Sequence, residues 1–445
     1  MRNDSRSDSQ KNYHTKNFQI QASPRKFKNC LYLLIATVVC GTVMVCYSVP
    51  SFLPIGTRAK WTVYYPITKN KTINPDVSGT KPDHQKMVFK SNSTYPHFYK
   101  PVSFHSSDKY RQKRSYSVDF THGYRPVTSN KSKLILFHNP PGWFTGFQKF
   151  CPQGLQKCPQ KHCDCSFDPK RMDKADAVIF DAVDLRYTSP PSKQANQVWI
   201  MFGIECPFYY NNHLYLTKQW RHAFNWTMTY RLDSDVILPY NVLYQMQQAP
   251  KANFSQIALN KSKSVLWFVS NCNTQSKRQQ YVKELRKYIT VDIHGRCGPL
   301  KCSGPKCDIL YQQYRFYLSF ENTVCVDYIT EKFFKVYSHR NIVPVVRGGA
   351  DYQSLVPKGT YINAADFSSP KELATYLKYL ETNVTAYAEI LEAKSRYTHS
   401  YIGTTYESAF CDICVKLHNL DQYHQYYNDS VRWLQEDACH SPKDV

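Results

Sequence analysis

The chain has 445 residues, which is enough for two ordinary domains with extensions rather than for one domain alone. Lysine and arginine number 57 against 34 aspartate and glutamate, giving a formal net charge of +23 and an isoelectric point near 9.3. Such an excess of positive charge suits nucleic acid, an anionic membrane surface or a phosphorylated substrate. Composition alone does not distinguish these partners.

An uncharged run of 20 residues, 30–49, is predicted to be a transmembrane signal anchor, because a helix of this length spans the roughly 30 Å bilayer core. Residues 1–29 hold seven basic side chains against two acidic ones. By the positive-inside rule they form a cytoplasmic tail, and the remainder is lumenal, as in a single-pass type II membrane protein. A cleaved signal peptide is the alternative, but the tail and the apolar run are long for one. A lumenal domain also has no access to nucleic acid.

Three of the 16 cysteines fall in the apolar run, which leaves 13 for the lumen. In an oxidising compartment this density predicts several disulfides, and the odd number predicts at least one free or intermolecular thiol. Sequons after the apolar run are glycosylation candidates: Asn70, Asn92, Asn130, Asn225, Asn253, Asn260, Asn383 and Asn428.

Residues 50–130 are rich in proline, serine, threonine, asparagine and lysine and have no sustained periodicity. We expect a stem that holds the folded part away from the membrane. Within it, residues 111–114 read Arg-Gln-Lys-Arg and resemble a proprotein-convertase site. A solvated run of charge is the plainer interpretation and the one we favour.

Ordered structure is expected to begin with a strand at residues 133–138. Four closely spaced cysteines follow, Cys151, Cys158, Cys163 and Cys165. Their spacing is compatible with a zinc site, but the secreted context favours disulfides.

Two buried-type strands are predicted at residues 177–180 and 198–202, and Glu205 follows the second beside a group of aromatic side chains. Burial at such a place raises the pKa of a carboxyl group and suits a general base, while aromatic faces suit sugars. A glutamate after a strand is nevertheless more often a solvated loop residue.

Residues 264–270, 276–288 and 291–295 are predicted to form a strand, a helix and a strand, the rhythm of a Rossmann-like half. Ser270 and Asn271 end the first strand, and Arg278 lies at the start of the helix. Basic side chains and backbone donors at a helix N-terminus can bind a diphosphate.

Residues 316–349 have the pattern strand, loop, helix, strand. Asp327 is predicted to cap the helix, with Ile329, Phe333 and Val336 along its apolar side. In open α/β sheets, nucleotides bind at the carboxyl end of such a first strand.

Within this stretch, FYLSFEN, DYITEKFF and VPVV resemble the donor-site signature of the α1,3-fucosyltransferases, which transfer fucose from GDP-fucose to the 3-hydroxyl of N-acetylglucosamine. The resemblance covers roughly residues 133–420. It implies an α/β fold with two facing Rossmann-like domains of the GT-B type. The acceptor side is then residues 131–258, the GDP-fucose domain residues 259–410, and the segment tied by disulfides residues 411–445.

The resemblance also implies functional residues. Glu205 is the general base, in Glu205-Cys206-Pro207 where the family has Glu-Ser-Pro, and Thr323 stands where the family usually has serine. The implied donor-binding residues are Tyr230, Ser270, Asn271, Arg278, Tyr317, Asn322, Tyr328, Glu331 and Lys332. Lys332 would meet the leaving diphosphate and Glu331 the ribose hydroxyls.

Asp233 and Asp235 resemble the metal-binding DxD of other glycosyltransferases, but the family does not use this pair for metal, so none is assigned. No cofactor is expected to be required, with a divalent metal at most stimulatory. Cys411 and Cys414 form a CxxC that suits redox chemistry or half a zinc site, whereas the family implies structural disulfides.

The predicted function is inverting fucosylation of N-acetylglucosamine on glycoprotein glycans in the Golgi membrane. We favour the N-glycan core as acceptor, because residues 151–210 differ most from the Lewis-type pattern. Lewis-type fucosylation of antennal lactosamine is the alternative. A membrane-anchored glycan-binding protein without turnover is an alternative of another class, which the set of Glu205, Arg278 and Lys332 disfavours.

Overall fold

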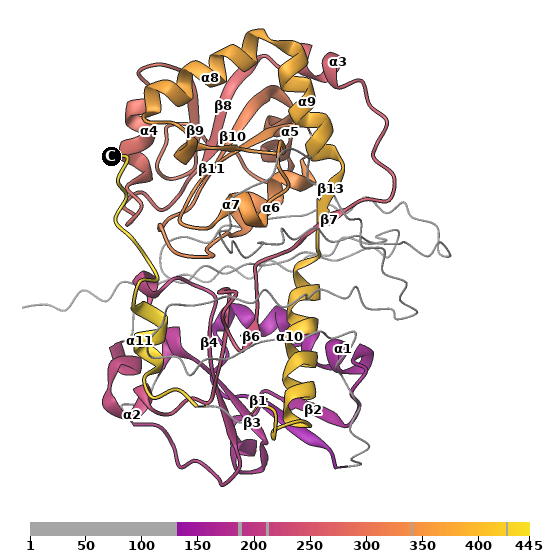
Figure 1. Ribbon diagram of the computed structural model, residues 1–445, viewed down its shortest axis with the longest axis vertical. Coiled ribbons are helices and arrows are strands. Elements are labelled where there is room, and N and C mark those ends of the chain that lie inside the picture. The colour runs from indigo at the N-terminus through magenta and orange to yellow at the C-terminus, as the bar shows by residue number, and fades with distance from the viewer. Residues whose placement is uncertain (1–130, 186–188, 211–212, 340, 424–425) are drawn as a thin grey trace, which may run out of the picture.

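The computed structural model describes residues 131–445 apart from 186–188, 211–212, 340 and 424–425 (Figure 1). The predicted tail, signal anchor and stem lie outside the described residues, as do the basic motif at 111–114 and the sequons at Asn70, Asn92 and Asn130. Within the described part, no helix combines the length and the apolar character needed to cross a membrane.

The first domain is built on a parallel sheet of six strands in the order β2-β1-β3-β4-β5-β6. In chain order they are β1 (Lys133–Phe137), β2 (Cys163–Ser166), β3 (Ala177–Asp181), β4 (Val198–Gly203), β5 (Trp226–Thr229) and β6 (Val236–Ile237). Strands β3 and β4 are buried along their whole length, as near-continuous apolar runs are when helices cover both faces of a sheet.

Helices pack on both faces of this first sheet. On one face lie α1 (Phe150–Lys157) and α10 (Ile402–Leu417), and on the other α2 (Lys218–Arg221) and α11 (Ser430–Gln435). Helices α1 and α10 approach closely at Gly154, where a Cβ atom would come within 2.4 Å of the carbonyl oxygen of Glu407. A larger residue at this position would push the two helices apart.

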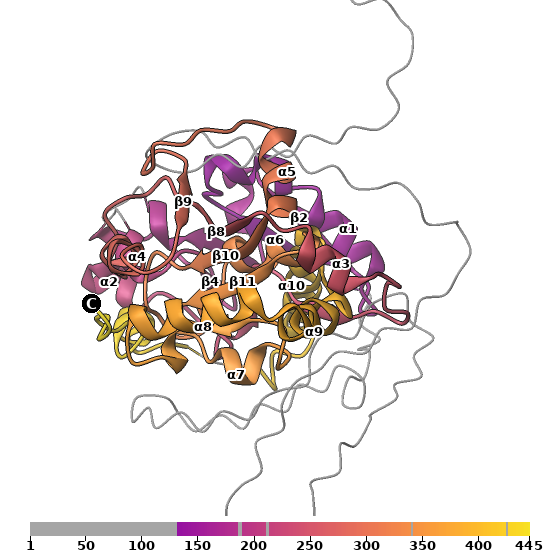
Figure 2. The same ribbon diagram turned by 90° about the horizontal axis from the view of Figure 1, so that it is seen from above.

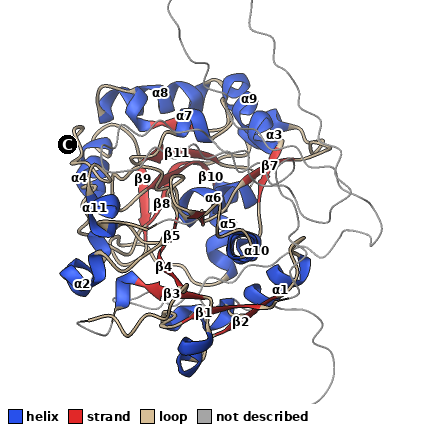
Figure 3. Cartoon of the chain, turned by 60° about the horizontal axis from the view of Figure 1, so that its bottom comes forward, coloured by secondary structure: helices blue, strands red, loops and turns tan. Residues whose placement is uncertain are grey.

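The second domain has a parallel sheet of five strands in the order β12-β11-β10-β8-β9. The strands are β8 (Lys263–Phe268), β9 (Val291–His294), β10 (Tyr314–Phe320), β11 (Val343–Arg347) and β12 (Ile362–Asn363). One face is covered by α3 (Phe254–Leu259), α4 (Arg278–Leu285), α8 (Pro370–Thr382) and α9 (Val384–Ser395). The other face carries α5 (Pro305–Gln313) and α6 (Glu331–Ser338), and α7 (Tyr352–Leu355) packs beside α6. Figure 2 shows α8 and α9 lying over this sheet, and Figure 3 shows the strands of both sheets in one view.

The chain crosses between the domains three times. The first two crossings run past β7 (Leu243–Gln245) and β13 (Tyr397–His399), which pair antiparallel between the domains. The third follows α11, and there a disulfide between Cys325 and Cys439 fixes the C-terminal segment to the second domain. The C-terminus therefore lies beside α4 (Figure 1).

Both predicted domain boundaries fall inside helices. The boundary at 258/259 cuts α3, whose Ala258 is buried in the core of the second domain. The boundary at 410/411 cuts α10, which packs along its length on the first domain. The expected C-terminal segment is thus mostly an integral part of the first domain, because the apolar side of α10 completes its core.

Helix α6 begins later than the sequence pattern suggests. Its N-cap is Thr330, whose hydroxyl accepts from the backbone N–H of Lys332, and not Asp327. Ile329 precedes the helix but packs in the same buried cluster as Phe333, and the predicted Val336 is buried as well.

Candidate active site

The carboxyl-terminal edges of the two sheets face one another, and Glu205 lies where they meet. It follows β4 by two residues and is partly exposed. The hydroxyl of Tyr328, from the second domain, donates to Oε2 of Glu205 over 2.9 Å. The ring of Tyr328 is buried and packs edge-on against Tyr230, with 4.9 Å between ring centroids. A side chain of one domain thus orients a carboxylate of the other.

The surroundings of Glu205 favour proton acceptance. Burial raises the pKa of Glu205, while the positive charge of Lys332 and the hydrogen bond from Tyr328 act in the opposite direction, and the net shift is upward. A raised pKa makes this carboxylate a stronger base than a glutamate in water. The hydroxyl of Tyr240 donates to the carbonyl oxygen of Ile204 over 3.0 Å and fixes the backbone just before Glu205.

Lys332 stands in the first turn of α6, with its side chain 23% exposed. Its Nζ donates to Oγ1 of Thr330 (2.9 Å) and Oε1 of Glu331 (3.1 Å), and lies 3.6 Å from Oε2 of Glu321. Burial acts to lower the pKa of Lys332, but the two carboxylates outweigh it and raise the pKa. The ammonium group is therefore held charged at the N-terminus of a helix, where the helix dipole also attracts anions.

Glu321, which the sequence interpretation missed, organises this region. It is fully buried at the end of β10 and accepts from the backbone N–H of Thr330 (2.9 Å) and from its hydroxyl (2.8 Å). Burial raises the pKa of Glu321, against the effect of Lys332. The available signal was a glutamate directly after the apolar strand FYLSF, where a carboxylate is costly unless it is paired.

Arg278 begins α4 and is 3% exposed. Its guanidinium donates to the carbonyl oxygens of Phe320 (2.7 Å) and Asn271 (3.1 Å), and its Nε has no hydrogen-bond partner among the described residues. No carboxylate of the described chain lies within ion-pair distance of it, although Glu321 acts on it from farther away. A buried guanidinium that lacks a close counter-ion favours binding of an anion.

The other polar residues predicted at the edge of the second sheet line the same interface. Asn271 Nδ2 donates to the hydroxyl of Tyr209 over 3.3 Å, a second hydrogen bond between the domains. Ser270 is partly exposed, and Asn322 is partly exposed just after β10. These three residues and Arg278 thus follow the neighbouring strands β8 and β10, at the edge where parallel sheets place their ligands.

Three further predicted donor-binding residues differ in their burial and lie in different surroundings. Tyr230 is buried beside Tyr328, and its hydroxyl has no partner among the described residues. Glu331 is 46% exposed and pairs with Lys332, which lowers its pKa despite the opposite effect of burial. Tyr317 lies within β10 and is buried under the Lys335 ammonium, 5.1 Å from its ring centroid. The structure therefore groups Tyr317 with the face of the sheet under α5 and α6.

Asp327 joins the donor-side loop to the first domain. Its φ of 59° is in the left-handed region, where residues other than glycine are strained. Its Oδ2 accepts from the backbone N–H of Leu232 over 3.1 Å. Burial raises the pKa of Asp327 to about 6. Since Tyr328 is the next residue, this contact also sets the position of the hydroxyl that reaches Glu205.

The C-terminal segment closes over the same loop. The backbone N–H of Val326 donates to the carbonyl oxygen of Ala438 (2.8 Å), next to the disulfide of Cys325 with Cys439. Farther on, Asp444 accepts two hydrogen bonds of 2.6 Å from the buried guanidinium of Arg347. The loop between β10 and α6 is thus held from the first domain and from the C-terminus.

The DxD-like pair is occupied by protein groups. Asp233 receives two hydrogen bonds from the guanidinium of Arg231, at 2.8 and 2.9 Å. Asp235 is buried and accepts from the backbone N–H of Thr227 and from the hydroxyl of Tyr427. Asp235 thus joins the first sheet to the C-terminal segment, and Asp233 holds Arg231, which donates to the carbonyl oxygen of Trp433 (2.6 Å).

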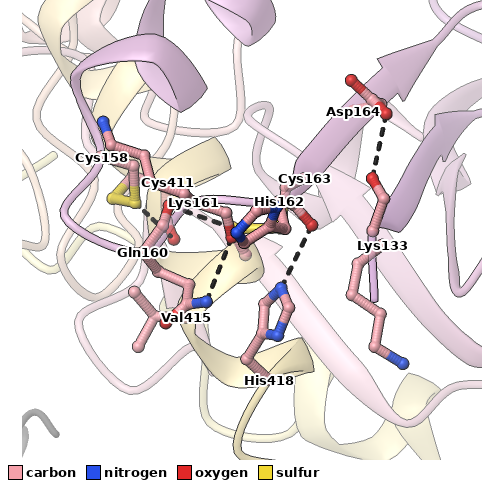
Figure 4. The surroundings of a disulfide bond; sticks show 12 residues. Lys133, Cys158, Gln160, Lys161, His162, Cys163, Asp164, Cys411, Val415 and His418 are labelled. Atoms are coloured by element: carbon pink, nitrogen blue, oxygen red, sulfur yellow. Dashed lines mark hydrogen bonds between the residues drawn. A yellow bond between two sulfur atoms is a disulfide. The ribbon is translucent and has the colours of Figure 1, made fainter. Parts of the chain in front are cut away.

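The CxxC cysteines take part in two disulfides. Cys411 pairs with Cys158 and Cys414 with Cys163, so α10 is bound to the strand and helix that carry the cysteine cluster (Figure 4). His418 lies near Cys163 and Cys414 at a distance compatible with a shared metal, but the two sulfurs are bonded to each other and offer no thiolate. The remaining described disulfides are Cys272–Cys297, Cys302–Cys307 and Cys325–Cys439.

Cys206 and Thr323, the two residues that differ from the fucosyltransferase pattern, meet across the domain interface. The buried thiol of Cys206 is hydrogen bonded to the side chain of Thr323. Burial raises the pKa of Cys206 to about 12, so the group is a neutral thiol at physiological pH. The cysteine thus keeps a hydrogen-bonding role next to Glu205 without offering a reactive thiolate.

Five predicted sequons fall in the described residues, and they differ in their surroundings. The side-chain oxygen of Asn225 accepts from the backbone N–H of Trp199 (2.9 Å) within the first sheet. The side chains of Asn253 and Asn383 cap α3 and α9. Asn253, Asn260 and Asn428 are exposed, and Asn383 is partly exposed. Exposure makes Asn253, Asn260 and Asn428 better placed to carry a glycan than Asn225, which is only partly exposed.

Comparison with known proteins identifies the class. The model for the N-terminal region of fucosyltransferases matches residues 130–241, and that for the C-terminal region of glycosyltransferase family 10 (fucosyltransferase) matches residues 258–433. The chain belongs to glycosyltransferase family 10.

Relatives within the family specify the linkage. Glycoprotein 3-α-L-fucosyltransferase A of Drosophila melanogaster is 34% identical over 79% of this chain and 73% of its own length. α-(1,3)-Fucosyltransferase C of the same organism is 33% identical over 69% of this chain and 79% of its own. A crystal structure of an α1,3-fucosyltransferase with GDP-fucose aligns over 60% of this chain and 82% of that chain, with 18% identity and a TM-score of 0.41. This protein is an α1,3-fucosyltransferase.

Proposed function

We propose that this enzyme binds GDP-fucose in its second domain and transfers fucose, with inversion, to the 3-hydroxyl of an N-acetylglucosamine bound against its first domain. The observation that carries the proposal is Arg278, a buried guanidinium without a carboxylate at ion-pair distance in the described chain. Together with Lys332 it places two cations at helix N-termini on the edge that faces Glu205. A diphosphate supplies the counter-charge that Arg278 lacks.

The proposed chemistry is a single displacement. Glu205 takes the proton of the acceptor 3-hydroxyl while that oxygen attacks C1 of fucose, and the bond from C1 to the diphosphate oxygen breaks. Arg278 and Lys332 stabilise the negative charge that develops on GDP. This scheme assigns no metal, and the carboxylates of Asp233 and Asp235 are already engaged by protein groups.

We further propose the innermost N-acetylglucosamine of N-glycans as the acceptor. The Drosophila relative with 34% identity is named for action on glycoproteins, and it aligns over more of this chain than the relative named only for its linkage. Transfer to antennal lactosamine is the second candidate.

The proposed location is the Golgi lumen, behind a single N-terminal signal anchor. The five disulfides of the described chain support an oxidising compartment. Labelling an epitope at the C-terminus in selectively permeabilised cells tests this topology.

The acceptor is tested by offering purified full-length enzyme labelled GDP-fucose with a core N-glycopeptide and free lactosamine in parallel. Product on the glycopeptide alone supports the core acceptor, and product on lactosamine alone overturns it in favour of the Lewis-type reaction. Binding of GDP and of glycans with no product on either acceptor would favour the glycan-binding alternative.

A further inference from the structure

Two cysteines outside the disulfides lie in contact within the first domain. Cys151 is in α1 and fully buried, and Cys165 is in β2 and partly exposed. Both side chains pack in the core cluster under α10, and the thiol of Cys165 lies near enough to that of Cys151 to raise its pKa, in addition to the larger effect of burial. Their separation in sequence is short, but they belong to different elements.

The periodicity of each element directs both sulfurs to the same place. Cys163 and Cys165 are two residues apart in β2, so they project from the same face of the sheet, and Cys163 already reaches α10 on that face. Cys151 is in the first turn of α1 and Cys158 is its C-cap residue, seven positions and close to two helical turns later, so the two lie on one side of the helix. Cys158 also reaches α10.

We propose that Cys151 and Cys165 form a sixth disulfide. It would join α1 to β2, whereas Cys158–Cys411 joins α1 to α10 and Cys163–Cys414 joins β2 to α10. The three elements would then be linked pairwise into a closed triangle around one edge of the first sheet. Figure 4 shows the region where two sides of this triangle meet.

Forming this disulfide requires an oxidant, and the disulfide of a thiol–disulfide oxidoreductase can serve as one. The more exposed sulfur, of Cys165, attacks that disulfide as a thiolate, forms a mixed disulfide and releases one thiol of the oxidant. The thiolate of Cys151 then attacks the sulfur of Cys165 and releases the second thiol. Two protons and two electrons leave the enzyme, and the oxidant is reduced to a dithiol.

The pairing also leaves Cys206 as the single unpaired thiol among the 13 cysteines that follow the apolar segment. An oxidising compartment does not stably maintain two thiols in contact while five other pairs are formed around them. Cys206 is different because its neighbour is Thr323.

The direct test uses full-length enzyme made through a secretory pathway, alkylated while denatured without reductant and then mapped by mass spectrometry. We expect a linked peptide pair containing unalkylated Cys151 and Cys165, and an alkylated Cys206. Alkylation of both Cys151 and Cys165, with Cys411 and Cys414 still linked, would overturn the proposal. Linkage of either one to a different cysteine would overturn it as well.

A set of three variants tests the bond independently of the mapping. If the bond exists, C151A, C165A and the double variant lower the unfolding midpoint by the same roughly 5–10 °C, because each removes the same cross-link. If the double variant instead shows the sum of the single effects, the two sulfurs are not bonded. Should C151A fail to fold, equal midpoints for C165A and wild-type protein decide the matter against the bond.

Discussion

The hydroxyl of Tyr328, in the second domain, donates a hydrogen bond to Oε2 of Glu205 in the first domain, with 2.9 Å between the two oxygens. The hydrogen bond stabilises the ionised carboxylate and so lowers the pKa of Glu205 against the effect of burial. The pKa of Glu205, which we propose as the base, is therefore tuned by a loop of the second domain, so in this proposal proton acceptance depends on the two domains being correctly docked.

Replacing Tyr328 with phenylalanine keeps the ring and removes only this hydrogen bond. The pKa of Glu205 should rise, so the acidic limb of the pH dependence of kcat/KM should move to higher pH. We expect kcat near neutral pH to fall by about tenfold, the order of one hydrogen bond to a charged group. An unchanged pH dependence of kcat/KM would mean that the hydroxyl of Tyr328 does not act on the carboxylate of Glu205.

Replacing Arg278 with alanine should weaken GDP binding, measured by calorimetry, by roughly 10- to 100-fold, as expected for lost charge-assisted hydrogen bonds. R278K keeps the positive charge but not the planar guanidinium, so its GDP affinity should lie between those of R278A and wild-type protein. Arg286, exposed just after the C-terminal end of the same helix, provides the matched control. Equal losses for R278A and R286A would show that the effect is one of net charge only.

Glu321 should be more important for folding than for contact with substrate. Its replacement by alanine leaves the buried donors of Thr330 without their acceptor and should cost about 2–4 kcal/mol of unfolding free energy. E321Q retains an acceptor for Thr330 and should cost less, and because it removes a negative charge beside Lys332 it should leave the KM for GDP-fucose unchanged or lower it. Chemical denaturation measures the predicted change in unfolding free energy, and steady-state kinetics with varied GDP-fucose measures the predicted behaviour of the KM. Equal stability of E321A and wild-type protein would contradict the role given to Glu321.

Much of the fold was predictable because parallel strands buried on both faces are continuous apolar runs. Strands β1, β3, β4, β8 and β9 lie within one or two residues of their predicted positions. The positions of Glu205 and Arg278 after such strands marked them only as candidates, because a glutamate or arginine at such a place is more often a solvated or structural residue. The resemblance to the fucosyltransferases supplied their predicted roles.

The parts that were missed depend on contacts distant in sequence. Asp327 and Thr330 are both good capping residues, and only the position of buried Glu321 decides that the helix begins after Thr330. The return of α10 to the first domain is likewise invisible to local periodicity. The contact between Cys206 and Thr323 could not be foreseen, because it requires the domains to be docked.

Asp327 gives a prediction for stability against pH. Its pKa of about 6 in the folded protein lies above the usual unfolded value near 3.9, so between about pH 4 and pH 6 the folded state binds more protons. Stability should therefore fall as pH rises through this window, and level off above it. D327N keeps the acceptor for Leu232 and tolerates the left-handed backbone, but it has no charge to bury.

We expect D327N to be more stable than wild-type protein by about 1–3 kcal/mol at pH 7 and by little at pH 4, in urea unfolding at both values. Loss of stability in D327N that is equal at the two pH values would mean instead that the carboxylate charge holds the loop.

The most direct test of the account replaces Glu205 with glutamine, which preserves shape and removes the base. We predict that transfer of fucose from GDP-fucose falls by at least about 10³-fold, of the order of a lost general base. GDP affinity, measured on the same preparation, should change less than about threefold, because we propose that Arg278 and Lys332, and not Glu205, hold the diphosphate. Transfer that stays within tenfold of the wild-type rate would contradict the assignment of Glu205 as the base. Loss of GDP binding would show instead that Glu205 holds the two domains together and has no separate role in catalysis.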